Sequence, residues 1–181
     1  MLVMTAALLL AGAGHWSTAS EVDRIADLVN DYREYHGLPP VPLSRSLTQV
    51  AAAHARDLEN NNPDAATDAA GRRCNMHSWS GASGATPVCY TADHARAAQM
   101  WSKPREITRG RYTAQGFEIA ARYSGGIDAD MAFDLWRSSS AHDAVILEDG
   151  RWQGSNWQAM GIAVNGRYAV VWFGKAPDPA R

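Results

Sequence analysis

An Asn165-Gly166 pair between two apolar runs near the C-terminus is the feature that most limits what this chain can fold into. The runs span 160–164 and 167–173 and consist mainly of apolar residues. An Asn-Gly pair favours a two-residue turn in which both central residues adopt positive φ. The sequence therefore predicts an antiparallel β-hairpin with Asn165-Gly166 at its turn.

Helical periodicity and capping residues account for most of the chain before that hairpin. Helices are predicted at 20–36, from Ser44 or Ser46 to Leu58, from Thr91 to about Trp101, from Asp128 or Asp130 to Trp136, and from Ser140 onward. Pro104 interrupts the third helix, and a short strand is predicted at 117–119. Helices followed by an antiparallel hairpin are typical of the α+β class, in which helices pack on a small sheet.

The last two predicted helices carry the details that bear on a site. The first of them is expected to face inward with Met131, Leu135 and Trp136. A capping box at 140–143 begins the next helix and places His142 in its first turn.

The N-terminus carries an apolar run, 2–11, followed by a small-x-small sequence at 17–19. This is the pattern of a signal peptide, although no basic residue precedes the apolar run. The run is too short to span a bilayer. We therefore predict a signal peptide at 1–19, an exported domain at 20–176 and a tail at 177–181. The alternative is an N-terminal apolar helix packed on the domain.

Size and charge limit the remaining possibilities. The 181 residues are enough for one domain with its own core, and the formal net charge is −2. No basic stretch favours nucleic acid or an anionic membrane surface. The expected protein is a secreted or periplasmic monomer with no nucleic-acid partner and no stable membrane span.

Cys74 and Cys89 are the two cysteines of the chain. An even count in an exported chain favours a disulfide, which would close a loop of about fifteen residues. Two lone cysteines do not form a zinc framework. Two buried thiols remain the alternative if the chain is not exported.

The six histidines have different settings. His36 and His54 lie on apolar helical faces, which favours core histidines with satisfied hydrogen bonds. His94 is expected on the surface or as a local cap, and His15 lies at the end of the predicted signal peptide.

His77 and His142 have settings better suited to chemistry. His77 lies in a long polar loop at 60–86, and loops of this length inside a compact domain are usually functional or tied down. His142 lies at a helix N-terminus, which favours the neutral imidazole that a metal ligand or general base requires. Spacing alone does not bring the two together, and neither a Gly-x-Ser-x-Gly nor a His-Glu-x-x-His motif is present.

Six segments occur in the order and spacing of the motifs of a known family. They are 27–33 with 37–40, 50–58, Met76-His77-Ser78, Phe117-Glu118-Ile119-Ala120, Trp136 with 139–142, and 161–164 with 168–174. Together they resemble the CAP superfamily (cysteine-rich secretory proteins, antigen 5 and pathogenesis-related 1 proteins) in its shorter bacterial form. The resemblance covers about 21–175, essentially the whole expected mature chain.

The resemblance implies an α-β-α sandwich with a small, mostly antiparallel sheet and an open cleft. His77 and His142 would be its two site histidines and would hold a metal, with Glu118 as the site glutamate. Ser139 and Trp136 are expected in the same cleft. Ser139 stands where larger members carry a second glutamate, and the family's glycine and asparagine beside Glu118 are replaced here.

An added loop at 148–158 is either a roof over this cleft or ordinary core packing. Its two tryptophans, Trp152 and Trp157, fit both interpretations equally.

Three functions are compatible with the resemblance. The first is a binding module whose cleft holds Zn²⁺ or another divalent cation weakly and accepts a lipid, glycan or peptide. The second is a hydrolase, with His77, Glu118 and His142 as candidate catalytic residues around a metal, or with Ser139 or Ser140 activated by His142. The third is a non-catalytic extracellular scaffold. A common fold does not decide among them.

Overall fold

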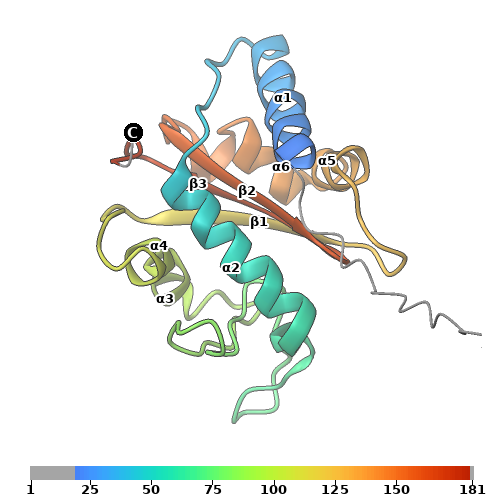
Figure 1. Cartoon of the computed structure of the whole chain (residues 1–181), viewed down its shortest axis with the longest axis vertical. Helices are drawn as coiled ribbons and strands as arrows, with labels where there is room; N and C mark the ends of the chain where they lie inside the picture. The colour runs from blue at the N-terminus through green and yellow to red at the C-terminus, as the bar shows by residue number, and fades with distance from the viewer. Residues whose placement is uncertain (1–18, 180–181) are drawn as a thin grey trace, which may run out of the picture.

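A three-stranded antiparallel sheet is the centre of the computed structural model, which describes residues 19–179 (Figure 1). The strands are β1 (Gly116–Arg122), β2 (Ala159–Asn165) and β3 (Tyr168–Gly174), in the spatial order β1-β3-β2. Every residue of β3 is buried, because this strand lies between the other two and both faces of the sheet are covered.

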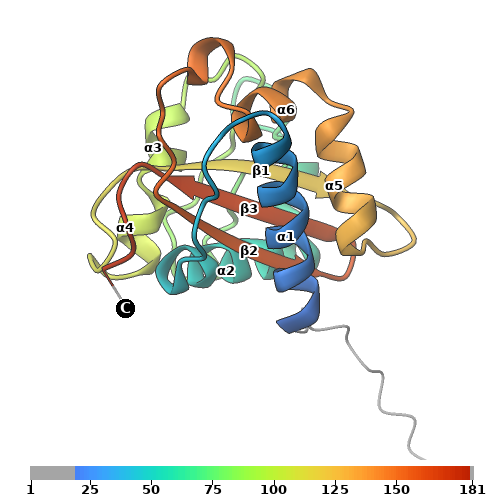
Figure 2. The same ribbon diagram turned by 90° about the horizontal axis from the view of Figure 1, so that it is seen from above.

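Helices cover both faces of the sheet. They are α1 (Ala19–Tyr35), α2 (Arg45–Asn61), α3 (Ala97–Trp101), α4 (Lys103–Ile107), α5 (Ala129–Arg137) and α6 (Ser140–Ile146), with the 3₁₀ turns η1 (Pro63–Ala65) and η2 (Gly150–Trp152). Helices α1 and α5 lie side by side on one face (Figure 2), and α2 packs on the other.

Alternation along β3 separates the two cores. Val171 and Phe173 join the apolar cluster under α1, α5 and α6, whereas Val170 and Trp172 join the cluster under α2. Successive side chains of a strand point to opposite faces, so one buried strand contributes to both layers. The expected α+β class and α-β-α sandwich are confirmed.

The predicted hairpin is present, but its turn lies one residue further along. Asn165 pairs with Tyr168, so the turn residues are Gly166 and Arg167, and Asn165 belongs to β2. Gly166, at the first central position, has a φ of +58°. Tertiary contact selects this register: the Glu59 carboxylate on α2 accepts the Arg167 backbone N–H at 3.0 Å and also binds its guanidinium.

The second helix begins as predicted, with Ser44 as its N-cap and its Oγ accepting from Leu47 N at 2.9 Å. Asp178, in the segment predicted as a tail, accepts from the hydroxyls of Ser44 and Ser46 at 2.8 Å each. The C-terminal segment therefore ties the beginning of α2 to the end of the sheet.

Two predictions on the short helices before β1 were wrong. Thr91 caps no helix: α3 begins at Ala97, because Asp93 binds the Thr91 hydroxyl and the Ala95 N–H in a turn. Pro104 does not end a helix but lies in the first turn of α4, where its missing N–H costs nothing.

The capping box at 140–143 does not form. Ser139 is the N-cap of α6, and the Asp143 carboxylate instead accepts the Tyr32 hydroxyl of α1 at 3.0 Å. His142 nevertheless lies in the first turn, as predicted.

Two predicted core positions are on the surface. Leu135 is 41% exposed, because α5 faces inward with Ala132, Phe133 and Trp136. His36 lies beyond the end of α1 and is exposed.

The predicted signal peptide at 1–19 falls outside the described residues except for Ala19, which begins α1. Within residues 19–179, no helix combines the length and apolarity needed to cross a membrane.

Candidate functional site

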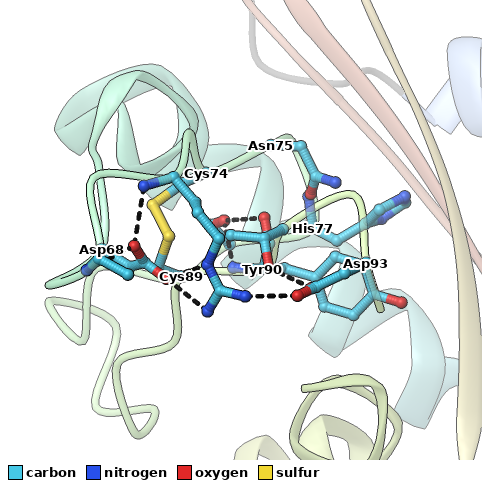
Figure 3. The surroundings of a disulfide bond; sticks show 11 residues. Asp68, Cys74, Asn75, His77, Cys89, Tyr90 and Asp93 are labelled. Atoms are coloured by element: carbon cyan, nitrogen blue, oxygen red, sulfur yellow. Dashed lines mark hydrogen bonds and ion pairs between the residues drawn. A yellow bond between two sulfur atoms is a disulfide. The ribbon is translucent and has the colours of Figure 1, made fainter. Parts of the chain in front are cut away.

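The loop that carries His77 is held by a disulfide between Cys74 and Cys89, as predicted, with a Cα–Cα distance of 5.0 Å. Figure 3 shows that His77 and Tyr90 lie beside this bond. Asn75 N–H donates to the Tyr90 carbonyl at 2.9 Å, and the Asn75 side chain accepts the His77 N–H at 3.0 Å. The two cysteine-bearing segments thus form one framework around His77.

An ionic cluster closes the far side of the same framework. The Arg72 guanidinium lies 2.7 Å from the Asp68 carboxylate and also binds Asp93. Residues on both sides of the disulfide are therefore tied, which explains how so long a polar loop stays ordered.

Glu118 of β1 is the centre of the site, and its side chain is completely buried. One carboxylate oxygen, Oε2, accepts from Nδ1 of His77 at 2.9 Å. The other, Oε1, binds Nδ1 of His54. Both oxygens of the carboxylate are therefore occupied by imidazoles.

His54 of α2 is the site residue that sequence reasoning missed. It is fully buried with satisfied hydrogen bonds, as predicted, but one of its partners is the site glutamate. Its other nitrogen, Nε2, donates to the Ser78 carbonyl at 3.0 Å, and its ring stacks on Trp79 at 4.2 Å. The sequence places His54 on the inward face of α2, seven residues after Leu47. This position indicates that the side chain is buried, but it does not indicate which group forms a hydrogen bond with it.

The pKa of Glu118 is lowered. Burial pushes this pKa upward, but the charge and hydrogen bond of His54, followed by those of His77, outweigh burial. When Glu118 is ionised, both nitrogens of His54 donate to oxygen, and the two side chains form a buried ion pair. Such a pair is tolerated where the remaining donors and acceptors have partners, which the Ser78 carbonyl provides here.

His142 reaches the site from α6. Its pKa is lowered, first by burial and then by the nearby His77. Its ring forms no hydrogen bond to any of residues 19–179. The lowered pKa favours a neutral imidazole with a free electron pair.

His77, Glu118 and His142 line a single cavity of about 920 Å³. Ser139 and Trp136, which were expected in this cleft, do not line it. Trp136 is completely buried in the core, and Ser139 caps α6 with its backbone carbonyl.

The remaining wall of the cavity combines aromatic rings with aliphatic side chains and with the charged residues Asp149, Arg151 and Lys175. Its aromatic rings are those of Tyr90, His94, Trp101, Phe117 and Trp152. His94 is not in a helix: its φ is +56°, and its Nδ1 forms a hydrogen bond of 2.9 Å with the Tyr90 hydroxyl.

The two tryptophans of the added loop have different places. Trp152 of η2 lines the cavity, so this part of the loop borders the cleft. Trp157 is core, 3% exposed, and its indole N–H donates to the Val145 carbonyl at 2.8 Å. Each of the two interpretations therefore describes one tryptophan.

The donor set limits what a metal could find here. Around Glu118, His54 has both nitrogens engaged and Glu118 both oxygens, so the nitrogens without a partner among the described residues are Nε2 of His77 and those of the His142 ring. Within the described part of the chain, no group of three or more His, Cys, Asp or Glu side chains is arranged to hold a metal ion. These residues fit a cation held by two imidazoles and not a closed structural zinc site, which has four protein ligands.

Comparison with known proteins adds the family. The family model described as CAP, the cysteine-rich secretory protein family, matches residues 26–167. A comparison with curated protein sequences gave no match.

Solved structures with a similar fold come from bacteria. An extracellular SCP-domain protein of Bacillus anthracis has a TM-score of 0.57 and 19% identity over 87% of this chain. An outer surface protein of Borrelia burgdorferi has a TM-score of 0.55 and 16% identity over 89% of this chain and 97% of its own. A cysteine-rich secretory protein of Staphylococcus aureus has a TM-score of 0.53 and 15% identity over 87% of this chain. The chain spans 41% of the Bacillus protein and 38% of the Staphylococcus protein.

Proposed function

Because the chain belongs to the CAP family of cysteine-rich secretory proteins, we propose that it is an exported binding protein whose cleft holds a divalent cation weakly and accepts a small ligand. The observation that carries the proposal is that two imidazoles, those of His77 and His142, line one cavity.

The two imidazoles are in the form that a cation requires. Because Glu118 Oε2 accepts from Nδ1 of His77, the electron pair of that ring lies on Nε2. A carboxylate behind a histidine in this way fixes its tautomer and raises its basicity toward a metal. The lowered pKa of His142 supplies a second neutral ring. A cation such as Zn²⁺ would offer coordination positions to an oxygen or nitrogen of the ligand.

The walls of the cleft favour a ligand with an apolar part. Trp101, Phe117 and Trp152 border the same cavity as the imidazoles, and its volume is within the range of small-molecule sites. An amphipathic molecule, with its polar end at the histidines and its apolar part along these rings, matches this division better than a fully polar glycan. A lipid or an apolar peptide has this character.

Export is supported by two independent observations. The Cys74–Cys89 disulfide is typical of an oxidising compartment. Proteins of the same fold are described as extracellular, as an outer surface protein and as secretory.

Binding is favoured over hydrolysis by the state of the candidate catalytic groups. Glu118 would have to give up an imidazole partner to act as a base on water. Ser140 lines the cleft, but the ring of His142 has no orienting carboxylate among the described residues. A serine nucleophile normally depends on a histidine oriented in that way.

The test is calorimetric titration of the metal-free full chain with Zn²⁺, beside the variants His77→Ala and His142→Ala. His36→Ala is the matched control, because His36 is exposed and does not line the cavity. We expect weak binding to the wild type and the control and a loss of at least about tenfold in each cleft variant. Equal affinity in all four proteins would refute the cation site, and a scaffold role would then be favoured.

A further inference from the structure

His54 lies beneath the cleft and does not line the cavity, yet it contacts the group on which His77 depends. It is 0% exposed, and it reaches Glu118 from α2, the helix on one side of the sheet. His77 reaches the same carboxylate from the loop that the Cys74–Cys89 disulfide closes. A carboxylate with an imidazole on each oxygen connects the two histidines.

We propose that His54 is a positioning residue of the cleft: by holding Oε1 of Glu118, it commits Oε2 to His77 and so decides which nitrogen of His77 faces the ligand. The effect of this arrangement on the cation rests on the proposed function. The arrangement of protons can be measured without any ligand.

The contacts around His54 hold its ring in the one orientation in which Nδ1 faces Glu118. Its Nε2 donates to the Ser78 carbonyl at 3.0 Å, which fixes the orientation of the ring. Its face stacks on Trp79 with an interplanar angle of 8°. Trp79 and Val88 exchange backbone hydrogen bonds of 2.8 and 2.9 Å, so the support of His54 belongs to the same framework that carries His77.

Across residues 19–179, His54 and His77 are the hydrogen-bond partners that hold the Glu118 carboxylate in place. Glu118 of β1 stands opposite Trp172 of β3, and its carboxylate is bound by His54 and His77. Without His54, Oε1 would be a buried acceptor with no donor, which costs free energy and favours rotation or protonation of the carboxyl. Either change would release Nδ1 of His77 from its fixed role as the donor.

A packing role alone predicts a different result. If His54 merely fills space beside Trp79, a phenylalanine of similar shape should leave His77 unchanged. If His54 positions Glu118, the position of its donor matters. Asparagine places an amide nitrogen near Nδ1, whereas glutamine places one near Nε2, so these two variants separate the hydrogen bond from the burial of a polar group.

The experiment is nitrogen-15 NMR of the histidine rings in the metal-free full chain at about pH 8, which reports the nitrogen that carries the proton. Wild type and His54→Asn should show His77 with its proton on Nδ1. His54→Phe and His54→Gln should show a mixture of the two His77 tautomers, and their Zn²⁺ affinity should fall about tenfold. His36→Asn is the control and should match the wild type.

An unchanged His77 tautomer in both His54→Phe and His54→Gln would overturn the proposal. The wild type alone is a second test if these variants do not fold, because a His77 proton on Nε2, or a His54 without a proton on Nε2, would also overturn it. Expected tautomers in a protein that binds no Zn²⁺ would leave the positioning role standing and refute the cation site. Zn²⁺ binding together with a His77 tautomer that does not respond to substitution of His54 would support the cation site and refute the positioning role.

Discussion

Two walls of the cleft, one carrying His77 and the other His142, are built in opposite ways. The ring of His77 is held by Glu118, which is held in turn by His54, and a disulfide and an Asx turn fix its backbone. The ring of His142 stands on the first turn of α6 without a hydrogen-bond partner among residues 19–179. One wall is organised before a ligand arrives, and the other is free to adjust to it. Substitutions on the two walls should therefore have unequal effects on stability.

The largest expected effect is at the centre of the organised wall. Glu118→Ala leaves the buried His54 without its carboxylate partner, and removing one member of a buried ion pair costs about 3–5 kcal/mol. Urea denaturation of wild type and variant measures the change in the free energy of unfolding. A loss below about 1 kcal/mol would show that the His54–Glu118 pair contributes little, and the contrast between the walls would disappear.

The next effect is that of the disulfide. In Cys74→Ser combined with Cys89→Ser, the closed loop of about fifteen residues is opened, and the chain-entropy model gives a loss of about 3 kcal/mol. The same denaturation experiment measures it. NMR signals of the His77 loop should broaden or shift while those of α6 stay in place. An equal disturbance of both histidines would contradict the separate construction of the two walls.

Acid should act on the two walls in different pH windows. The pKa of His142 is lowered by burial, so the unfolded chain binds the proton better, and stability falls as pH drops below about 6.5. Burial raises the pKa of Glu118, but His54 and His77 together lower it further, so the net shift is downward. The contribution of ionised Glu118 to folding stability is therefore present above about pH 4.5 and is lost as pH falls further. Denaturation between about pH 2 and pH 8 should show both declines. His142→Ala should remove the upper one and leave the lower, and a curve identical to wild type would refute this assignment.

The smallest expected effect is the stability change in His142→Ala at pH 7. An unpartnered ring contributes little to folding, so we expect a change of less than about 1 kcal/mol, although Zn²⁺ binding is lost. Thermal denaturation and calorimetry on the same samples measure the two effects. A loss comparable to that of Glu118→Ala would show that His142 is as firmly built into the fold as His77.

Much of this site could be anticipated from the sequence, but its connections could not. His77, Glu118 and His142 were selected by the order of motifs, and all three line one cavity. The order of motifs also suggested Ser139 and Trp136, which do not line it. A motif identifies a neighbourhood of the chain, whereas the direction of a side chain depends on helix phase and on partners far away in sequence.

His54 shows the limit most clearly. A histidine on an apolar helical stripe looks like a core residue, and His54 is one, but its carboxylate partner lies 64 residues away. The turn of the hairpin shows the same limit on a smaller scale. Asn165-Gly166 predicted the hairpin correctly, and Glu59 of α2 moved its centre to Gly166 and Arg167.

The sequence by itself determined the α+β class, the longer helices and the hairpin, and it favoured the disulfide, because local propensity, hydrophobic period and cysteine count act over short stretches of chain. Only the tertiary structure decided the hairpin register, the inward face of α5 and the His54–Glu118–His77 connection. These depend on which groups meet inside the fold, where a buried donor or acceptor without a partner is costly and a contact between distant segments outweighs a local preference.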